Sequence, residues 1–125
     1  MPLKRKNYAA LAQPVGPYVH AVESNGMLYL SGITAFGSPA QGKSIATQAE
    51  AVFEQIEIIA RAEGVSVASL VKVTIFITSF EEVESLRAAL FKFYGTDLPA
   101  SSLVQVASLF SPEVSIEIEA VLALS

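Results

Sequence analysis

The stretch Val71–Ser79, VKVTIFITS, constrains the fold more than any other part of the sequence. Its side chains alternate in character, which is the period of a β-strand that packs one face against a core. The predicted core-facing residues are Val71, Val73, Ile75 and Ile77, and those of the other face are Lys72, Thr74, Phe76 and Thr78. Segments of helical periodicity lie on both sides of this strand. The chain is therefore expected to combine a sheet with helices.

The two helical segments have recognisable ends. The first begins with Ser44, a suitable N-cap, and ends before Gly64, which suits the position after a helix. Between them, apolar residues recur at helical spacing. Ser79 and Glu82 have the spacing of a capping box at the start of the second helix, and Gly95 ends it. Each helix thus connects one strand to another.

Four further strands are predicted around these elements. Tyr18–Glu23 and Met27–Ile33 form a hairpin, because Asn25-Gly26 between them is a strong turn signal. Ser101–Leu109 and Ser115–Leu124 follow the second helix. The expected order is β-β-α-β-α-β-β, an α+β domain in which some strands pair in parallel through right-handed crossovers.

The balance of helices and sheet predicts an oligomer. A chain of 125 residues has the size of one domain, so residues 1–125 are expected to form a single domain. Two helices can cover one face of its sheet, whereas the other face carries partly apolar residues such as Phe76. Hydrophobic residues make up 52% of the chain and charged residues only 16%. An apolar face without a cover within the chain favours association with a further subunit.

Composition excludes several partners and sites. The net charge is −4, and the basic cluster Lys4-Arg5-Lys6 is interpreted as a solvated N-terminal segment, so no nucleic-acid partner is expected. The lack of cysteine excludes disulfides, thiolate metal sites and a cysteine nucleophile. No signal peptide and no apolar run of membrane-spanning length are evident. We therefore expect a cytoplasmic protein with no membrane partner.

Few residues indicate chemistry by themselves. His20, the single histidine, is interpreted as a polar residue on a strand face rather than a catalytic base. Ser31 lacks the flanking glycine and the base that a nucleophile elbow requires. Glu117 and Glu119 project from one face of a strand, roughly 7 Å apart. These carboxylates either face solvent or line an oligomer cleft, where one of them would be a general acid or base.

An ordered set of short segments resembles the reactive-intermediate deaminase family, RidA/YjgF. Gly16-Pro17-Tyr18 is similar to its G-P-Y, and Leu30-Ser31-Gly32 to its V-S-G. Val71–Thr78 is similar to the V-K-T-T-V-F strand, and Pro99–Ser102 to P-A-R-S. Ile116–Ala120 resembles V-E-I-E-A. The match runs in order from about residue 14 to the end of the sequence.

This resemblance implies both an assembly and a chemistry. The family fold is a chorismate-mutase-like α+β domain, and three subunits form a trimer with a central barrel and ligand clefts between subunits. Archetypal members hydrolyse small 2-imino acids and their enamine tautomers to keto acids and ammonia. They use no metal and no organic cofactor. The resemblance therefore predicts a homotrimer that binds a small molecule without a cofactor.

The resemblance also predicts a site and a change within it. Glu117 is the candidate for positioning water, and the candidate ligand contacts are Tyr18, Ser31, Gly32, Ile33, Ser101 and Leu103. Ser101 stands where the family carries the arginine that grips the substrate carboxylate. Ile33 replaces a usual glutamine and Leu103 a usual cysteine. The predicted pocket is thus less polar than in the archetype and lacks its clamp for an anion.

Two functions follow as expectations. The first is a trimeric small-molecule-binding or regulatory protein without archetypal 2-imino acid deaminase activity. The alternative is a cofactor-free imine or enamine deaminase, a hydrolase of a non-standard substrate without a carboxylate, in which Glu117 orients water. The ribonuclease activity attached to some relatives fits poorly with the acidic charge of this chain.

Overall fold

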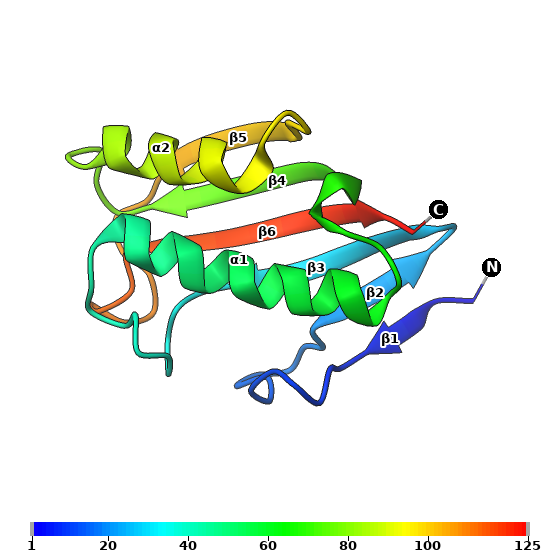
Figure 1. Cartoon of the computed structure of the whole chain (residues 1–125). Helices are drawn as coiled ribbons and strands as arrows, with labels where there is room; N and C mark the ends of the chain where they lie inside the picture. The colour runs from blue at the N-terminus through cyan, green and yellow to red at the C-terminus, as the bar shows by residue number, and fades with distance from the viewer. Residues whose placement is uncertain (1, 125) are drawn as a thin grey trace.

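A sheet of six strands forms one layer of the molecule, and two α-helices pack on one of its faces (Figure 1). The computed structural model describes residues 2–124. The elements in chain order are β1 (Lys4–Lys6), β2 (Ala21–Ser24), β3 (Met27–Ile33), α1 (Ile45–Ala62), the short 3₁₀-helix η1 (Val67–Ser69), β4 (Leu70–Ile77), α2 (Val83–Tyr94), β5 (Ala100–Gln105) and β6 (Ile116–Ala123). The predicted α+β architecture is confirmed.

The strand order is β1-β2-β3-β6-β4-β5. β6, the last strand in the sequence, therefore lies inside the sheet. β6 pairs antiparallel with both neighbours: Ile118 lies opposite Ile33 of β3 and opposite Ile75 of β4. β4 and β5 pair in parallel, joined through α2, as the crossover prediction requires. The centre of the core therefore lies under β6.

The alternation predicted for β4 holds except at its start. Val73, Ile75 and Ile77 are buried, but the side chain of Val71 is 43% exposed. The register with β6 shifts between Leu70 and Lys72, which inserts one extra residue into β4. Such a bulge reverses the facing of the residues before it, so Leu70 takes the buried position predicted for Val71. The assignment of Val71 to the core is wrong.

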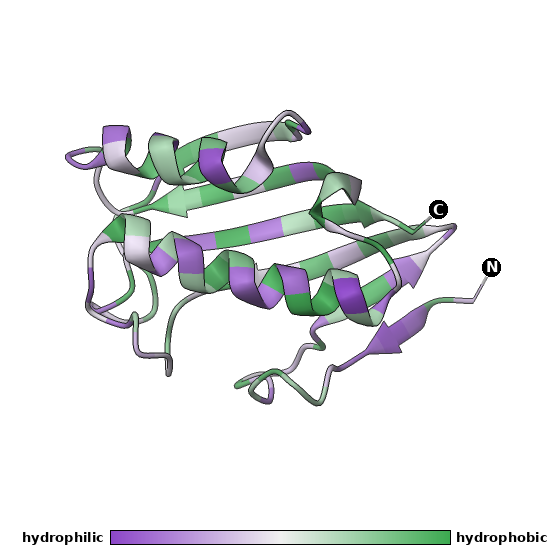
Figure 2. Ribbon diagram, in the orientation of Figure 1, coloured by the Kyte–Doolittle hydropathy of each residue, from purple (hydrophilic) through white to green (hydrophobic). Residues whose placement is uncertain are grey.

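The ends of α1 follow the sequence signals, whereas the start of α2 does not. Ser44 is the N-cap of α1 and its side chain accepts a hydrogen bond from the backbone N–H of Thr47. Gly64 follows with a φ of 77°, a value that favours glycine. At α2 the predicted capping box is wrong, because Glu82 is itself the N-cap and forms no side-chain cap. In Figure 2, α1 alternates between hydrophilic and hydrophobic residues, as expected for a helix with one buried face.

Aromatic side chains join the two helices. Phe53 of α1 is 2% exposed and stacks on Phe93 of α2, with ring centroids 3.8 Å apart. Tyr94 meets the same ring edge-on at 5.6 Å. These contacts fix α2 against α1 above β4 and β6.

The N-terminal segment forms a strand that the sequence analysis did not predict, although Lys4 and Arg5 are exposed, as expected for solvated residues. β1 pairs antiparallel with β2, with Arg5 opposite Val22. Two other predicted strands are shorter than expected: β2 begins at Ala21 and β5 ends at Gln105. Residues 18–20 and 106–109, which were predicted as strand, belong instead to connecting segments.

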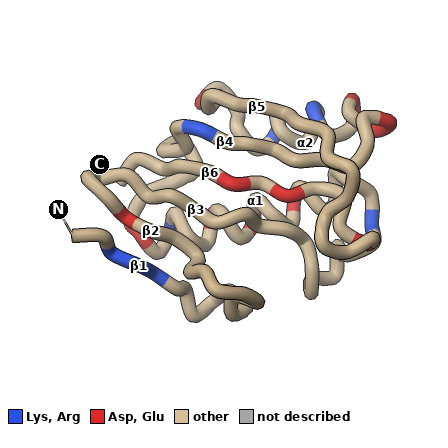
Figure 3. Tube along the Cα trace, turned by 180° about the vertical axis from the view of Figure 1, so that it is seen from behind, with Lys and Arg blue, Asp and Glu red and all other residues tan. Residues whose placement is uncertain are grey.

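The second face of the sheet carries no helix within the described residues, as Figure 3 shows from behind. Tyr29 of β3 and Val104 of β5 lie on this open face and are 49% and 41% exposed. The two acidic positions of β6, Glu117 and Glu119, lie in its middle. Neither α1 nor α2, nor any other helix in residues 2–124, is long and apolar enough to cross a membrane.

Candidate functional site

A cavity of about 410 Å³ opens at the end of β3. The ladder between β2 and β3 ends at Ala21 and Leu30, and one further hydrogen bond runs from the N–H of Ser31 to the carbonyl of His20 at 3.0 Å. Ser31, Gly32 and Ile33, at the end of β3, line the cavity. The other walls come from the N-terminal segment 11–15, from α1, from β6 and from the loop before β6. These walls and the end of β3 thus bring together parts of the chain that are distant in the sequence.

Five of the seven predicted site residues line this cavity: Tyr18, Ser31, Gly32, Ile33 and Glu117. Ser101 and Leu103 lie elsewhere, on β5, with β4 and β6 between them and β3. Ser101 is exposed opposite Val73, and Leu103 packs against the core opposite Ile75. Within one chain these two residues are therefore separate from the cavity. Their role stays a prediction for an assembly in which β5 of one copy approaches the cavity of another.

The carboxylate of Glu117 lies against the backbone of Gly32. A Cβ atom added to Gly32 would lie 2.8 Å from Cδ of Glu117, so any larger residue would have to displace the carboxylate. Glu117 shares the open face of β6 with Glu119, and the two lie opposite Phe76 and Thr74 of β4. Burial raises the pKa of Glu117, and repulsion by Glu119 raises it further. Glu117 is thus a half-buried acid without a cation of its own among the described residues.

Ser31 and His20 are held by the backbone around them. The hydroxyl of Ser31 donates to the carbonyl of Val19 at 2.6 Å, which fixes the turn that carries Tyr18. Nδ1 of His20 accepts from the backbone N–H of Tyr8 at 2.9 Å, and Nε2 lies 2.8 Å from the carbonyl oxygen of Ala12. Since Nδ1 accepts, the ring proton is on Nε2. Both nitrogens of His20 therefore anchor the N-terminal segment, and neither is a free base.

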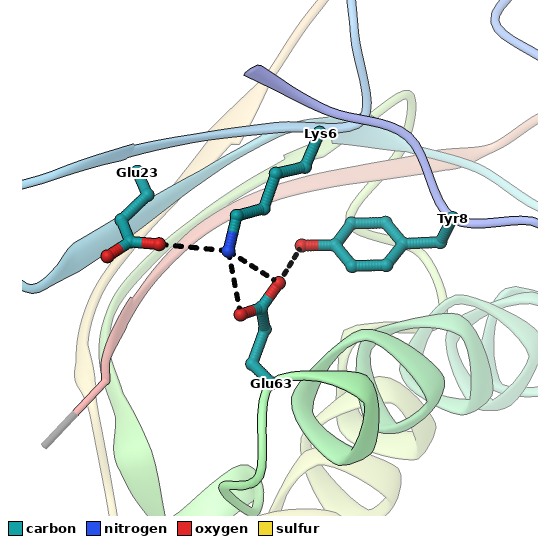
Figure 4. Close-up of polar contacts among 4 residues, drawn as sticks. All are labelled: Lys6, Tyr8, Glu23 and Glu63. Carbon is teal, nitrogen blue, oxygen red and sulfur yellow. Dashed lines mark hydrogen bonds and ion pairs between the residues drawn. The ribbon is translucent and has the colours of Figure 1, made fainter. Parts of the chain in front are cut away.

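An ionic cluster holds the same segment at its beginning (Figure 4). Nζ of Lys6 lies 2.9 Å from a carboxylate oxygen of Glu23 and 2.8 Å from one of Glu63, at the end of α1. The hydroxyl of Tyr8 donates to Glu63 at 2.8 Å. The cluster ties β1 and the following wall of the cavity to β2 and α1.

Replacement of Glu63 by glutamine should weaken this cluster in a pH-dependent way. Burial by itself would raise the pKa of Glu63, but the hydrogen bonds from Lys6 and Tyr8 and the charge of Lys6 outweigh it, and the pKa lies below 4.5. Glu63 therefore stabilises the folded state above pH 4.5, and this contribution is lost as the pH falls through the lowered pKa. At pH 7 the variant should lose about 1–3 kcal/mol in the free energy of unfolding.

Urea denaturation of the parent and the Glu63→Gln variant between pH 7 and pH 3 measures this effect. The difference between the two proteins should shrink in the acid range. Glu57→Gln is the matched control, because Glu57 pairs with Arg61 on the exposed face of α1, where an ion pair contributes about 0.3–0.5 kcal/mol. A difference that stayed constant down to pH 3 would contradict the assigned role of the Glu63 carboxylate.

Sequence analysis did not predict two aromatic residues of the cavity. Phe36, after β3, and Phe110, before β6, line the cavity, and their rings meet edge-to-face with centroids 4.9 Å apart. They are 48% and 61% exposed. Neither residue belongs to a helix or strand pattern, and their contact joins two loops distant in the sequence, so no local signal could have paired them.

Gln48 holds these two loops together from α1. It is the single polar residue among the buried residues of the described chain, at 1% exposure. Its Nε2 donates to the carbonyls of Lys43 at 2.9 Å and Glu113 at 3.3 Å, and its Oε1 accepts from the N–H of Ser115 at 3.0 Å. The N–H of Gly42 also donates to the carbonyl of Glu113, at 2.9 Å. The Phe36–Phe110 pair thus projects from two loops that share one buried support.

Metal ligation is not indicated by the side chains that the structure describes. No group of three or more His, Cys, Asp or Glu residues within 2–124 is arranged to hold a metal ion. The cavity offers one carboxylate, apolar surface and the hydrogen-bonding groups of the backbone and of polar side chains, among them those of Tyr18, Thr34 and Gln55.

Comparison with known proteins identifies relatives over almost the entire chain. The family model described as endoribonuclease L-PSP matches residues 9–124. The 2-iminobutanoate/2-iminopropanoate deaminase of Escherichia coli strain K12 is 33% identical over 113 residues, which covers 86% of this chain and 87% of that protein. The deaminase of the same name from Dermatophagoides farinae is 30% identical over 117 residues and covers 90% and 89%.

Solved structures agree with these sequence matches. The structure of yeast Mmf1 superposes with a TM-score of 0.86 at 29% identity, and the match covers 98% of each chain. The YjgF gene product of Escherichia coli gives a TM-score of 0.84 at 29% identity and covers 96% of this chain and 98% of that one. The likeness therefore includes the strands, the helices and the region of the cavity.

Proposed function

This chain belongs to the endoribonuclease L-PSP family, the RidA/YjgF family, and from that membership we propose that it binds a small molecule in the cavity at the end of β3. The observation that supports this proposal is the convergence of Tyr18, Ser31, Gly32 and Glu117 on one cavity. These residues come from the segments that match the family pattern. The fold is the α+β, chorismate-mutase-like arrangement of solved relatives.

We further propose that archetypal 2-imino acid deaminase activity is weak or absent. A 2-imino acid carries a carboxylate, and no lysine or arginine of the described residues lines the cavity. The resemblance of Pro99–Ser102 to the family's P-A-R-S supports the proposal, because it aligns Ser101 with the arginine that binds this carboxylate. Loss of one partner of a buried charged pair costs roughly 2–5 kcal/mol, on the order of thirtyfold to several thousandfold in affinity.

Hydrolysis of an imine without a carboxylate is the second candidate. The position of Glu117 supports it, because the carboxylate is half-buried against Gly32 and has no cation to neutralise it. In that reaction the carboxylate would orient a water molecule and accept its proton while the oxygen attacks the imine carbon. The carboxyl group of Glu117 returns this proton to the nitrogen, which gives a carbinolamine. The hydroxyl proton of the carbinolamine then passes to the nitrogen as the C–N bond breaks, with release of a carbonyl product and an amine or ammonia.

A homotrimer is the proposed assembly. Its support is the open face of the sheet, where apolar residues including Tyr29 and Val104 are uncovered by helices, together with the family membership. Light scattering at micromolar concentration should report about three times 13.3 kDa. A stable monomer would contradict both the trimer and any contribution of Ser101 from a neighbouring copy.

Turnover of 2-iminopropanoate is the experiment that tests the proposed loss of activity. The imine is generated in situ by an amino-acid oxidase, and pyruvate formation is compared with uncatalysed hydrolysis. The Escherichia coli relative named above provides the positive control under the same conditions. We expect a rate at least about thirtyfold below that control, the lower end of the cost of a missing cation. Equal rates would refute the proposal.

A further inference from the structure

The charge of the cavity is carried by one residue. Among the lining residues, all within the described part of the chain, Glu117 alone bears a full charge. His20 also lines the cavity but is neutral, because its Nδ1 accepts a hydrogen bond from a backbone N–H. A ligand in this cavity therefore meets a negative charge without a positive one beside it.

Four cations of the described chain have partners outside the cavity. Lys72 lies on β4 and donates to the hydroxyl of Ser102 at 2.9 Å. Lys6, Arg61 and Arg87 pair with carboxylates. A carboxylate ligand in the cavity would thus face Glu117 without compensation, and like charges in a partly desolvated site repel strongly.

The wall provided by the two loops is aromatic. The Phe36–Phe110 pair presents exposed ring surface to the cavity, and Tyr18 and Val15, which are 45% and 79% exposed, add to it. Exposed apolar surface that gathers around a concavity is typical of a binding site. Aromatic faces also attract cations. The apolar wall and the carboxylate thus favour the same kind of ligand.

The geometry points to an apolar amine, iminium ion or protonated imine as the ligand of this cavity, with its nitrogen at the Glu117 carboxylate and its hydrocarbon group against the Phe36–Phe110 pair. This inference rests on the proposed function, that the cavity holds a small molecule, and it adds the chemical class of that molecule. It makes Phe36 and Phe110 the residues that determine specificity.

Of the groups that line the cavity, the Glu117 carboxylate is the best hydrogen-bond acceptor for a cationic ligand nitrogen. The carboxylate is the strongest acceptor in the cavity, and a charge-assisted hydrogen bond to an ammonium or iminium N–H is roughly twice as strong as a neutral one. Burial and the neighbouring charge of Glu119 raise the pKa of Glu117. A cationic ligand would supply the donor and relieve the repulsion from Glu119.

Four probes that differ in charge or in ring separate these contributions. Benzylamine, benzyl alcohol and benzoate carry the same ring with positive, neutral and negative groups, and methylamine carries the charge without the ring. Titrations of the ¹⁵N-labelled full chain by NMR detect millimolar affinities and identify the residues that respond. Benzylamine should shift residues 31–36, Phe110 and Glu117, and should bind at least about tenfold more tightly than benzoate, the scale of one charged contact.

Variants assign each end of the ligand to its residue. Glu117→Gln should weaken benzylamine about tenfold and leave benzyl alcohol unchanged. Phe36→Ala and Phe110→Ala should weaken benzylamine about fivefold to tenfold and leave methylamine unchanged. Phe91→Ala is the matched control, because Phe91 is an exposed phenylalanine of α2, 63% exposed and outside the cavity. The dispersion of each spectrum shows whether the variant remains folded.

The outcomes separate this inference from the proposed function. Benzoate binding as tightly as benzylamine at the same residues would overturn the inference while the cavity remained a ligand site. Loss of that benzoate binding in Lys72→Ala would assign the missing cation to Lys72 of a second copy of the chain. If none of the four probes shifted residues 31–36, Phe110 and Glu117, the proposed function itself would fail.

Discussion

Replacement of Phe53 by alanine is expected to lower the free energy of unfolding by about 3–5 kcal/mol, the usual range for truncation of a buried phenylalanine. The ring is 2% exposed and contacts Phe93 and Tyr94 of α2. Its removal leaves a cavity between the helices and removes the contact that holds α2 against α1. Since native domains are stable by only about 5–15 kcal/mol, this loss would remove a large share of the stability.

Urea denaturation at one fixed protein concentration measures this loss, because an oligomer would make stability depend on concentration. Phe91→Ala removes the same side chain from an exposed site of α2, and should change stability by less than about 0.5 kcal/mol. A Phe53→Ala variant that lost less than about 1 kcal/mol would mean that the two helices are held chiefly by other contacts.

Gln48→Leu is expected to produce the second large effect. Leucine has a similar volume but cannot pair with the carbonyls of Lys43 and Glu113 or with the N–H of Ser115. Each buried group left without a partner costs about 1–3 kcal/mol, so the variant should lose at least that amount of unfolding free energy. The same change should loosen the two loops that carry Phe36 and Phe110.

Denaturation and NMR titration together test this second effect. The Gln48→Leu variant should be less stable and should bind benzylamine more weakly, although Gln48 does not line the cavity. Gln41→Leu gives a control, because Gln41 also connects the two loops, through Glu113, but at the exposed surface. Unchanged stability of Gln48→Leu would show that water or nearby groups satisfy the backbone left behind, and would refute the supporting role of Gln48.

Patterns confined to a few residues predicted most of the fold. The hairpin at Asn25-Gly26, both ends of α1 and the alternation in β4 depend on local backbone geometry, so the sequence displays them directly. The strand at Lys4–Lys6 was missed because its stability depends on Lys6 meeting Glu63, 57 positions later. The prediction of a capping box at Ser79 was wrong because the hydroxyl of Ser79 accepts a hydrogen bond from the backbone N–H of Glu81, in the turn before α2.

The candidate site was predicted where it coincides with short family motifs. Tyr18, Ser31, Gly32, Ile33 and Glu117 lie in such segments, and they meet at the cavity. Phe36 and Phe110 lie in loops, where neither spacing nor periodicity indicates a neighbour. Their contact depends on the buried network of Gln48, which emerges only when α1 is packed on the sheet.

The central position of β6 determines when the sheet can close during synthesis. β6 is the last of the six strands in chain order, yet β3 and β4 both pair with it. Without β6, β1–β3 and β4–β5 have no strand that joins them, so each group can pair only within itself. Joining them requires contacts between distant parts of the chain, which form slowly. The order of the strands therefore leaves the edges of β3 and β4 without their partner until Ile116–Ala123 is available, and an unpaired edge is a site for association with other chains.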